Sequence, residues 1–309
     1  IAWLLQNGHA TPGGILAVTF TNKAAKEMVA RLTAMLPVNV RGMWIGTFHG
    51  LCNRLLRAHH KAAGLPQAFQ ILDTQDQLSA IKRLCKQFNV DEERFPPKQL
   101  AYFIAGCKEE GMRPGDVPAH DADGRKKIEL YQLYEEQCQR EGVVDFGELM
   151  LRSYELLRDN DPIREHNQRR FRHILVDEFQ DTNPLQWQAL HAWLAGYAGS
   201  GGGSAAPSVF IVGDPKQSIY RFRRAEPQVF IAAQAFVRDG LGGDLLSCDH
   251  TRRNATGVIT AVNHAMGQAQ AQHETSGFRD HTTESRDPGV LLRLPAILPA
   301  DKDAGASAD

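Results

Sequence analysis

Two short apolar runs in the second half of the chain each end in acidic residues. The first, HILVDE, spans residues 173–178, and the second, VFIVGD, spans residues 209–214. Short apolar runs bounded by turn residues are typical of buried strands. Similar runs occur near the start of the chain, ILAVTF at residues 15–20 and GMWIGTF at residues 42–48. Apolar residues at helical spacing separate these runs, so the order of elements predicts an α/β fold with a mostly parallel sheet covered by helices on both faces.

The segment from about residue 75 to residue 170 has a different character. Its apolar residues recur at helical spacing, prolines punctuate it, and it shows no strand pattern. A chain of 309 residues is also too long for one core of ordinary size. We therefore predict an all-helical insertion within the α/β fold.

Charge and cysteine content restrict the classes of function. Lys and Arg number 35 and Asp and Glu number 36, so a surface that binds nucleic acid must be a local concentration of basic residues. The cysteines are odd in number and none forms a C-x-x-C pair, which argues against a zinc site or a disulfide framework and favours a reducing cytoplasm. No apolar run approaches the ~20 residues of a membrane span, so no membrane partner is expected.

The acids that end the two apolar runs suggest chemistry on phosphates. Ligands of open α/β sheets bind at the carboxyl ends of the strands, where Asp177, Glu178 and Asp214 would lie. One carboxylate at such a place can hold Mg²⁺ through water. Its neighbour can orient and deprotonate a water molecule that attacks a phosphate.

A structural role is the alternative for several polar residues nearby. Asn183 and Gln186 have the spacing of a helix capping box, and Asp214 and Gln217 repeat it. Capping does not explain two adjacent acids directly after an apolar run. The pattern alone therefore leaves metal–phosphate chemistry and a structural role as open alternatives.

Five longer stretches resemble the motifs of a known enzyme family. They are, in chain order, ILAVTFTNKAAKEM, GTFHGLCNRLLRAHH, VDFGELMLR, ILVDEFQDTN and VGDPKQSIYRFRRA. In this order they resemble successive motifs of the superfamily 1A DNA helicases, the UvrD/Rep/PcrA family. After about Trp187 the sequence is more similar to the RecB-type helicase-nuclease branch, which leads to the hypothesis that the chain joins parts of two related genes.

The resemblance implies a RecA-like P-loop NTPase motor domain that carries a helical insertion. Residues 1–50 and 171–249 would form motor domain 1A, residues 51–170 the insertion 1B, and residues 250–309 the start of domain 2A. The family's phosphate-binding loop reads G-x-x-x-x-G-K-[ST], but this chain contains no Gly-Lys pair. The first strand and this loop are therefore expected to precede Ile1, and the chain is expected to be a fragment that does not hydrolyse ATP by itself.

The resemblance also implies roles in a site for ATP and Mg²⁺. Asp177 would coordinate Mg²⁺, and Glu178, beside the metal, would be the general base for ATP hydrolysis. Gln217 would sense the γ-phosphate, and Arg253 would be an arginine finger that neutralises charge in the transition state. Arg252 stands where the family usually has an aromatic residue beside adenine, and its guanidinium plane can stack in the same way.

A surface for single-stranded DNA follows from the same resemblance. Its residues would be Phe20, Thr21, Asn22, Thr47, Phe48, His49, Tyr220, Phe222 and Arg223. Stacking of a base on an aromatic ring contributes ~1–3 kcal/mol without recognising sequence, and neighbouring arginines supply local positive charge. From the residues alone, core packing of Tyr220 and Phe222 and an ordinary helix start at His49 are the alternatives.

Together these features predict the motor half of an ATP-dependent 3′–5′ DNA helicase or translocase that acts in DNA repair or recombination. The expected partners are single-stranded DNA, junctions of single-stranded and double-stranded DNA, and DNA-repair proteins, in the cytoplasm at the nucleoid. Two alternatives are the helicase subunit of a RecB-type helicase-nuclease and a non-catalytic DNA-binding module.

Overall fold

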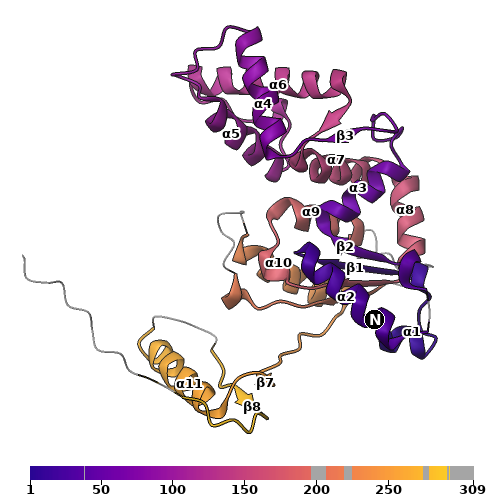
Figure 1. Cartoon of the computed structure of the whole chain (residues 1–309), viewed down its shortest axis with the longest axis vertical. Coiled ribbons are helices and arrows are strands. Elements are labelled where there is room, and N and C mark those ends of the chain that lie inside the picture. The colour runs from indigo at the N-terminus through magenta and orange to yellow at the C-terminus, as the bar shows by residue number, and fades with distance from the viewer. Residues whose placement is uncertain (38, 196–206, 219–224, 274–277, 291, 293–309) are drawn as a thin grey trace, which may run out of the picture. The chain divides into compact units, whose positions relative to one another are not determined.

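The structure is a computed structural model of the whole chain (Figure 1). It describes residues 1–37, 39–195, 207–218, 225–273, 278–290 and 292. The chain forms two compact units, Ile1–Asp244 and Leu245–Asp309. None of the described helices combines the length and the apolar character that a membrane span requires.

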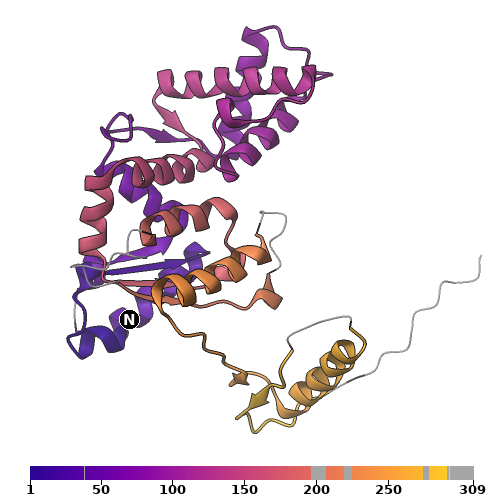
Figure 2. The same ribbon diagram turned by 180° about the vertical axis from the view of Figure 1, so that it is seen from behind.

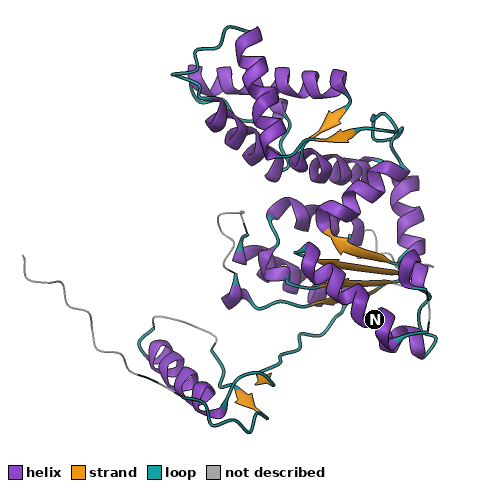
Figure 3. Cartoon of the chain, viewed as in Figure 1, coloured by secondary structure: helices purple, strands orange, loops and turns teal. Residues whose placement is uncertain are grey.

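The first unit is built on a parallel sheet with the strand order β2-β1-β5-β6 (Figure 3). Its strands are β1 (Ile15–Thr19), β2 (Trp44–Thr47), β5 (His173–Val176) and β6 (Ser208–Ile211). Every residue of β1 is buried, as a nearly continuous apolar strand requires in a sheet covered on both faces. The predicted parallel sheet is therefore confirmed. Thr19 pairs with Thr47, and Val18 with Val176, so the carboxyl ends of three strands meet at one edge.

Helices cover both faces of this sheet (Figures 1 and 2). On one face, Ile15 belongs to a core with α1 (Ala2–Gln6) and α2 (Asn22–Met35). On the other face, Leu16 and Val18 enter a larger core. The helices that contribute to this larger core are α3 (Phe48–Ala58), α7 (Phe146–Asp159), α8 (Asp161–Arg170), α9 (Pro184–Leu194) and α10 (Pro227–Ala235). Successive side chains of β1 thus enter different cores, as the two-residue period of a strand requires.

The helical insertion has a core of its own. Its helices are α4 (Thr74–Gln87), α5 (Pro97–Glu109) and α6 (Ala122–Glu141), which pack on one another and, through α5, on α7. Leu84, Ile104 and Leu130 are fully buried within it. The apolar residues at helical spacing between residues 75 and 170 therefore correctly predict helices there.

The expectation of a purely helical insertion is wrong in one detail. The strands β3 (Gln70–Ile71) and β4 (Val143–Val144) pair in parallel within it. Gly142 ends α6 in the left-handed conformation, with φ of 66°, and its carbonyl accepts a hydrogen bond from the Gln70 amide at 3.1 Å. Strands of two residues are too short to give a recognisable period in the sequence, which explains why the prediction missed them.

A cluster of buried charges lies between α5, α6 and α7. Lys108 is 1% exposed, and its Nζ atom lies 2.7 Å from a Glu135 oxygen and 2.9 Å from an Asp145 oxygen. A Glu148 oxygen lies 3.0 Å from the same atom. Burial disfavours the positive charge, but these carboxylates outweigh burial and raise the pKa of Lys108 well above its ordinary value. Arg113 adds two hydrogen bonds to Glu148, at 2.9 and 3.0 Å.

In the residues of the second unit that the structure describes, there is one long helix and a small strand pair. Its elements are α11 (Thr256–Ala271), β7 (His250–Thr251) and β8 (Thr282–Thr283), and the two strands pair in parallel. The Asn263 side chain exchanges two hydrogen bonds with the backbone of His281, at 2.8 and 2.9 Å. Arg279 binds the Asp249 carboxylate with two nitrogens, at 2.8 and 2.9 Å. The first contact ties the loop before β8 to α11, and the second ties the same loop to the residue before β7.

Candidate functional site

Two adjacent acids follow β5 at the carboxyl edge of the sheet. The Asp177 amide donates to the Val18 carbonyl at 2.9 Å, which extends the pairing of β5 with β1 by one residue. Glu178 then has a φ of 55°, in the left-handed region that residues other than glycine rarely adopt. Its amide donates to Asp177 Oδ1 at 3.0 Å. The chain therefore turns sharply at Glu178, so the Asp177 side chain is exposed while Glu178 is half-buried.

The Glu178 carboxylate is bonded to the end of β1. Its Oε2 atom accepts a hydrogen bond from the Thr19 hydroxyl at 3.1 Å and another from the Phe20 amide at 3.3 Å. Thr19 is fully buried, so no solvent competes at its side of this contact. Glu178, the predicted general base, is thus bonded to Phe20, the first residue of the predicted DNA surface.

Gln180 links the end of β5 to the end of β6. It lies in the short turn η4 (Phe179–Asp181), and its Oε1 atom accepts a hydrogen bond from the Asp214 amide at 3.1 Å. A side chain at Gly213 would place a Cβ atom 2.8 Å from that same Oε1 atom and 2.8 Å from the Phe230 ring. Any other residue at this position would therefore displace Gln180 or Phe230. No local pattern around Gln180 predicts this contact, although the residue lies between the two apolar runs that end in acids.

Asp181 is a buried acid close to the same turn. It is 6% exposed, and its Oδ1 atom has no hydrogen-bond partner among the described residues. Burial raises the pKa of Asp181, and the negative charge of Glu178 raises it further. Asp181 therefore takes up a proton more readily than an ordinary aspartate.

The capping alternative is confirmed for Asn183 and Gln186. Asn183 Oδ1 accepts from the Gln186 amide at 2.9 Å, and Gln186 Oε1 accepts from the Asn183 amide at 3.1 Å. This capping box at the start of α9 is confirmed. In the turn η5 (Pro215–Gln217), the Gln217 side chain instead donates to Asp214 Oδ2 at 3.0 Å. Gln217 therefore lies at the end of β6, bonded to the acid that precedes it.

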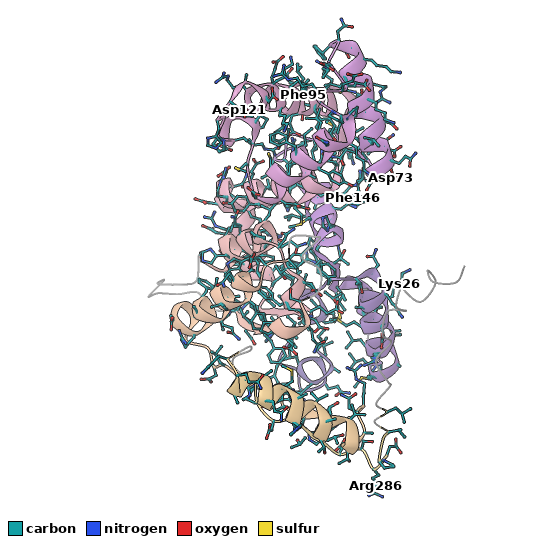
Figure 4. All side chains as sticks on the ribbon, turned by 90° about the vertical axis from the view of Figure 1, so that its left-hand side faces the viewer. Lys26, Asp73, Phe95, Asp121, Phe146 and Arg286 are labelled. Carbon is teal, nitrogen blue, oxygen red and sulfur yellow. The ribbon has the colours of Figure 1, made fainter. Side chains whose placement is uncertain are left out.

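The two predicted DNA segments lie next to each other because β1 and β2 are neighbours in the sheet. Thr21 caps α2 by accepting a hydrogen bond from the Ala24 amide at 3.1 Å, and Thr47 caps α3 by accepting one from the Gly50 amide at 3.2 Å. Both hydroxyl oxygens thus have a structural role. Asn22, in the first turn of α2, is exposed. Two lysines of the same helix, Lys23 and Lys26, are also exposed, and Lys26 is labelled in Figure 4.

The aromatic residues of the second segment have different environments. Phe48 packs against the core between the sheet and α7. His49 is in edge contact with the Phe146 ring, at 5.9 Å between centroids, and burial lowers the pKa of His49. Phe146, at the first turn of α7, is 47% exposed (Figure 4). Phe146 belongs to the stretch VDFGELMLR, but only the fold brings it to His49, so its contact was not predictable from the motif.

The remaining predicted residues are either outside the described residues or in the second unit. Tyr220, Phe222 and Arg223 lie outside the described residues. Arg252 and Arg253 belong to the second unit. There Arg252 forms an ion pair with Glu284 at 2.8 Å, and the Arg253 amide donates to the Thr251 hydroxyl at 3.3 Å.

The acids of this edge suit Mg²⁺ bound together with a phosphate. Across the described ranges, His, Cys, Asp and Glu side chains form no group of three or more that could hold a metal. Mg²⁺ commonly binds through one or two carboxylates, with water and substrate phosphates completing its shell. The exposed Asp177 carboxylate, with Glu178 beside it, fits this donor set.

Comparisons with known proteins agree on one family. The family model for the UvrD/REP helicase N-terminal domain matches residues 1–237. The chain is 45% identical over 268 residues to DNA helicase II of Haemophilus influenzae and 44% identical over 264 residues to DNA helicase II of Escherichia coli. It is 31% identical over 268 residues to the ATP-dependent DNA helicase PcrA of Bacillus subtilis.

These alignments cover 85–86% of the chain but only 35% of each of the three relatives. The chain therefore spans about a third of the length of the proteins that it resembles. The family match also continues beyond Trp187, so it does not depend on the first half of the sequence alone. The chain belongs to the UvrD/REP helicase N-terminal domain family.

Proposed function

We propose that these residues are the motor part of an ATP-dependent DNA helicase or translocase that moves 3′–5′ along single-stranded DNA. The observation that carries the proposal is the edge of the sheet where β1, β2 and β5 end. There the acids Asp177 and Glu178 lie beside the predicted DNA segment that follows β1, and Glu178 accepts a hydrogen bond from Phe20. The other predicted DNA segment follows β2, on the far side of β1. ATP chemistry and DNA binding would thus share one rigid edge.

The residues of this edge have separate proposed roles. Asp177 would hold Mg²⁺ on the ATP phosphates, with Glu178 beside it as the general base that takes a proton from the attacking water. Gln217, at the end of β6, would contact the γ-phosphate or that water. Arg253 would neutralise charge that develops in the transition state, and Arg252 would stack near adenine. ATP and Mg²⁺ are the proposed cofactors.

The proposed division of the chain follows these roles. Residues 1–50 and 171–249 would be motor domain 1A, residues 51–170 insertion 1B, and residues 250–309 the beginning of domain 2A. Single-stranded DNA, its junctions with duplex DNA and DNA-repair proteins are the proposed partners, and the cytoplasm at the nucleoid is the proposed location. This proposal is supported by the relatives, which bear the names DNA helicase II and ATP-dependent DNA helicase PcrA.

The complete product of the gene that encodes these residues tests the proposal. We expect oligo-dT to stimulate its ATP hydrolysis, and we expect ATP-dependent separation of a duplex with a 3′ single-stranded tail. A matched duplex with a 5′ tail is the control and should remain paired. DNA binding without ATP hydrolysis would instead identify a non-catalytic DNA-binding module. Degradation of the DNA alongside unwinding would identify the helicase subunit of a helicase-nuclease.

Phe20→Ala should weaken binding of oligo-dT to the 309-residue chain by ~1–3 kcal/mol, the contribution of one stacked base. Fluorescence anisotropy of a labelled oligonucleotide measures this affinity. The affinity of the wild-type chain and of the Phe20→Ala variant for oligo-dT should fall as the salt concentration rises. The reason is that Lys23, Lys26 and other basic side chains displace counterions from the phosphates. Phe88→Ala, which removes a 41% exposed aromatic ring from the insertion, is the matched control. Equal affinities for the Phe20 and Phe88 variants would remove Phe20 from the DNA surface.

The 309-residue chain by itself should not hydrolyse ATP. It contains no Gly-Lys pair and hence no loop of the form G-x-x-x-x-G-K-[ST] to hold the phosphates. Phosphate release measured with purified chain and oligo-dT should equal that of a Glu178→Gln variant prepared in parallel. Turnover that depends on Glu178 would show that another part of the chain binds the phosphates.

A further inference from the structure

The contact between Glu178 and β1 is unusual in its construction. A single carboxylate oxygen, Oε2, accepts both the Thr19 hydroxyl and the Phe20 amide, from residues 159 and 158 positions away in the chain. Hydrogen bonds to a charged acceptor are stronger than those between neutral groups. Thr19 is 0% exposed, so its hydroxyl has this carboxylate rather than water as its partner. The strained turn at Glu178 is what directs the side chain toward β1.

The strand order shows which way this contact directs the carboxylate. β1 lies on one side of β5, and β6 lies on the other. Gln217 follows β6, whereas Thr19 and Phe20 are at the end of β1. The Glu178 carboxylate is therefore held on the side of β5 that faces away from the residue proposed to contact the γ-phosphate. A general base acts only when it lies within hydrogen-bond reach of the proton that it removes.

One of the two donors belongs to the predicted DNA surface. The Phe20 amide begins the segment Phe20-Thr21-Asn22, and the Thr21 hydroxyl fixes the start of α2 directly after it. If this segment shifted on binding DNA, the Phe20 amide would change its position relative to Glu178 Oε2. A hydrogen bond weakens steeply as its geometry departs from linear.

We propose that Thr19 is a positioning residue that, with the Phe20 amide, holds the Glu178 carboxylate away from the nucleotide until single-stranded DNA occupies the neighbouring segment. This inference rests on the proposed function of the site. It adds a physical route by which DNA would stimulate ATP hydrolysis. The two states differ in their hydrogen bonds alone, because the Thr19 and Phe20 donors keep their protons in both.

Thr19→Val in the complete gene product tests the proposal, since valine keeps the branched shape and the strand preference while removing the hydroxyl. We expect ATP hydrolysis without DNA to rise about tenfold, the factor for one lost hydrogen bond to a charged group. The rate with saturating oligo-dT should stay near that of wild type, so the stimulation by DNA falls by a similar factor. The KM for ATP should change little. Thr19→Ser, which retains the hydroxyl, should restore wild-type behaviour.

A second measurement does not require ATP. In the 309-residue chain labelled with ¹³C at the glutamate carboxyl carbons, the signal missing from Glu178→Gln identifies Glu178. We expect oligo-dT to change the chemical shift of this signal in the wild-type chain. The Thr19→Val substitution, without DNA, should change it in the same direction. Thr19→Ala provides the same comparison if the valine variant does not fold.

Three results separate the proposals. DNA-stimulated hydrolysis in the wild type, with the same stimulation in Thr19→Val and an unmoved carboxyl signal, would overturn the role of Thr19 and leave the proposed function intact. If Thr19→Val lowered the rates of ATP hydrolysis without DNA and with oligo-dT by the same factor, Thr19 would be only a structural residue of β1. That result would also overturn the inference. Absence of any ATP hydrolysis in the wild type would overturn the proposed function and the inference together.

Discussion

The Lys108→Met variant will be less stable than the wild-type chain by about 3–5 kcal/mol, the usual effect of removing one partner from a buried ion pair. Methionine has a similar length but removes a cation that three carboxylates share, those of Glu135, Asp145 and Glu148. Asp145 is affected most, because Arg113 remains beside Glu135 and Glu148 whereas the ion pair of the buried Asp145 is with Lys108. Its Oδ2 atom also accepts hydrogen bonds from the Tyr134 hydroxyl at 2.9 Å and from Gln77 at 3.1 Å, but these neutral donors do not balance its charge. Urea unfolding followed by circular dichroism measures the loss.

Two further variants isolate the buried charge as the cause. Lys98→Met makes the same change at an exposed position of the same helix, and we expect it to alter the stability by less than ~0.5 kcal/mol. Adding Asp145→Asn to Lys108→Met should recover part of the stability, since it removes the uncompensated charge and keeps an amide oxygen that can cap α7. A Lys108→Met variant as stable as Lys98→Met would show that the cluster contributes nothing.

Local patterns were sufficient to predict much of the architecture. The apolar run at residues 15–20 predicted β1 because a strand buried on both faces has few polar positions. Asn183 and Gln186 predicted a capping box because both partners lie within one helical turn. In such cases the residues that interact are near neighbours in the sequence, so their spacing alone identifies the contact.

Contacts between distant segments were not predictable in this way. Nothing in the sequence around Glu178 indicates a left-handed backbone or a hydrogen bond to Thr19, 159 positions earlier. Phe146 meets His49 only because α7 packs against α3. Lys108 occurs in the polar stretch CKEEGMR, which is typical of a solvated helix end, and only the fold surrounds it with carboxylates from α6 and α7.

Glu178→Gln in the complete gene product should lower the kcat of DNA-stimulated ATP hydrolysis by ~10²–10⁴, because a carboxamide does not accept a proton from water at neutral pH. The KM for ATP should change far less, since Asp177 remains as a ligand for Mg²⁺. Glutamine has the shape of glutamate, and its side-chain oxygen can still accept from Thr19 and Phe20. The variant should therefore fold and bind oligo-dT like the wild type, which separates lost chemistry from lost structure.

Glu165→Gln is the matched control, because this exposed residue of α8 has a surface ion pair with Arg169 and should leave kcat unchanged. A loss of less than tenfold in Glu178→Gln would assign the proton transfer to another group.

The double variant Thr19→Val with Glu178→Gln adds a sharper comparison. If Thr19 acts only through the Glu178 carboxylate, its substitution has no effect on the rate once that carboxylate is gone, so the two changes are fully non-additive. A rate that still rises when Thr19 is replaced in the Glu178→Gln background would mean that Thr19 influences hydrolysis by a route that does not include Glu178.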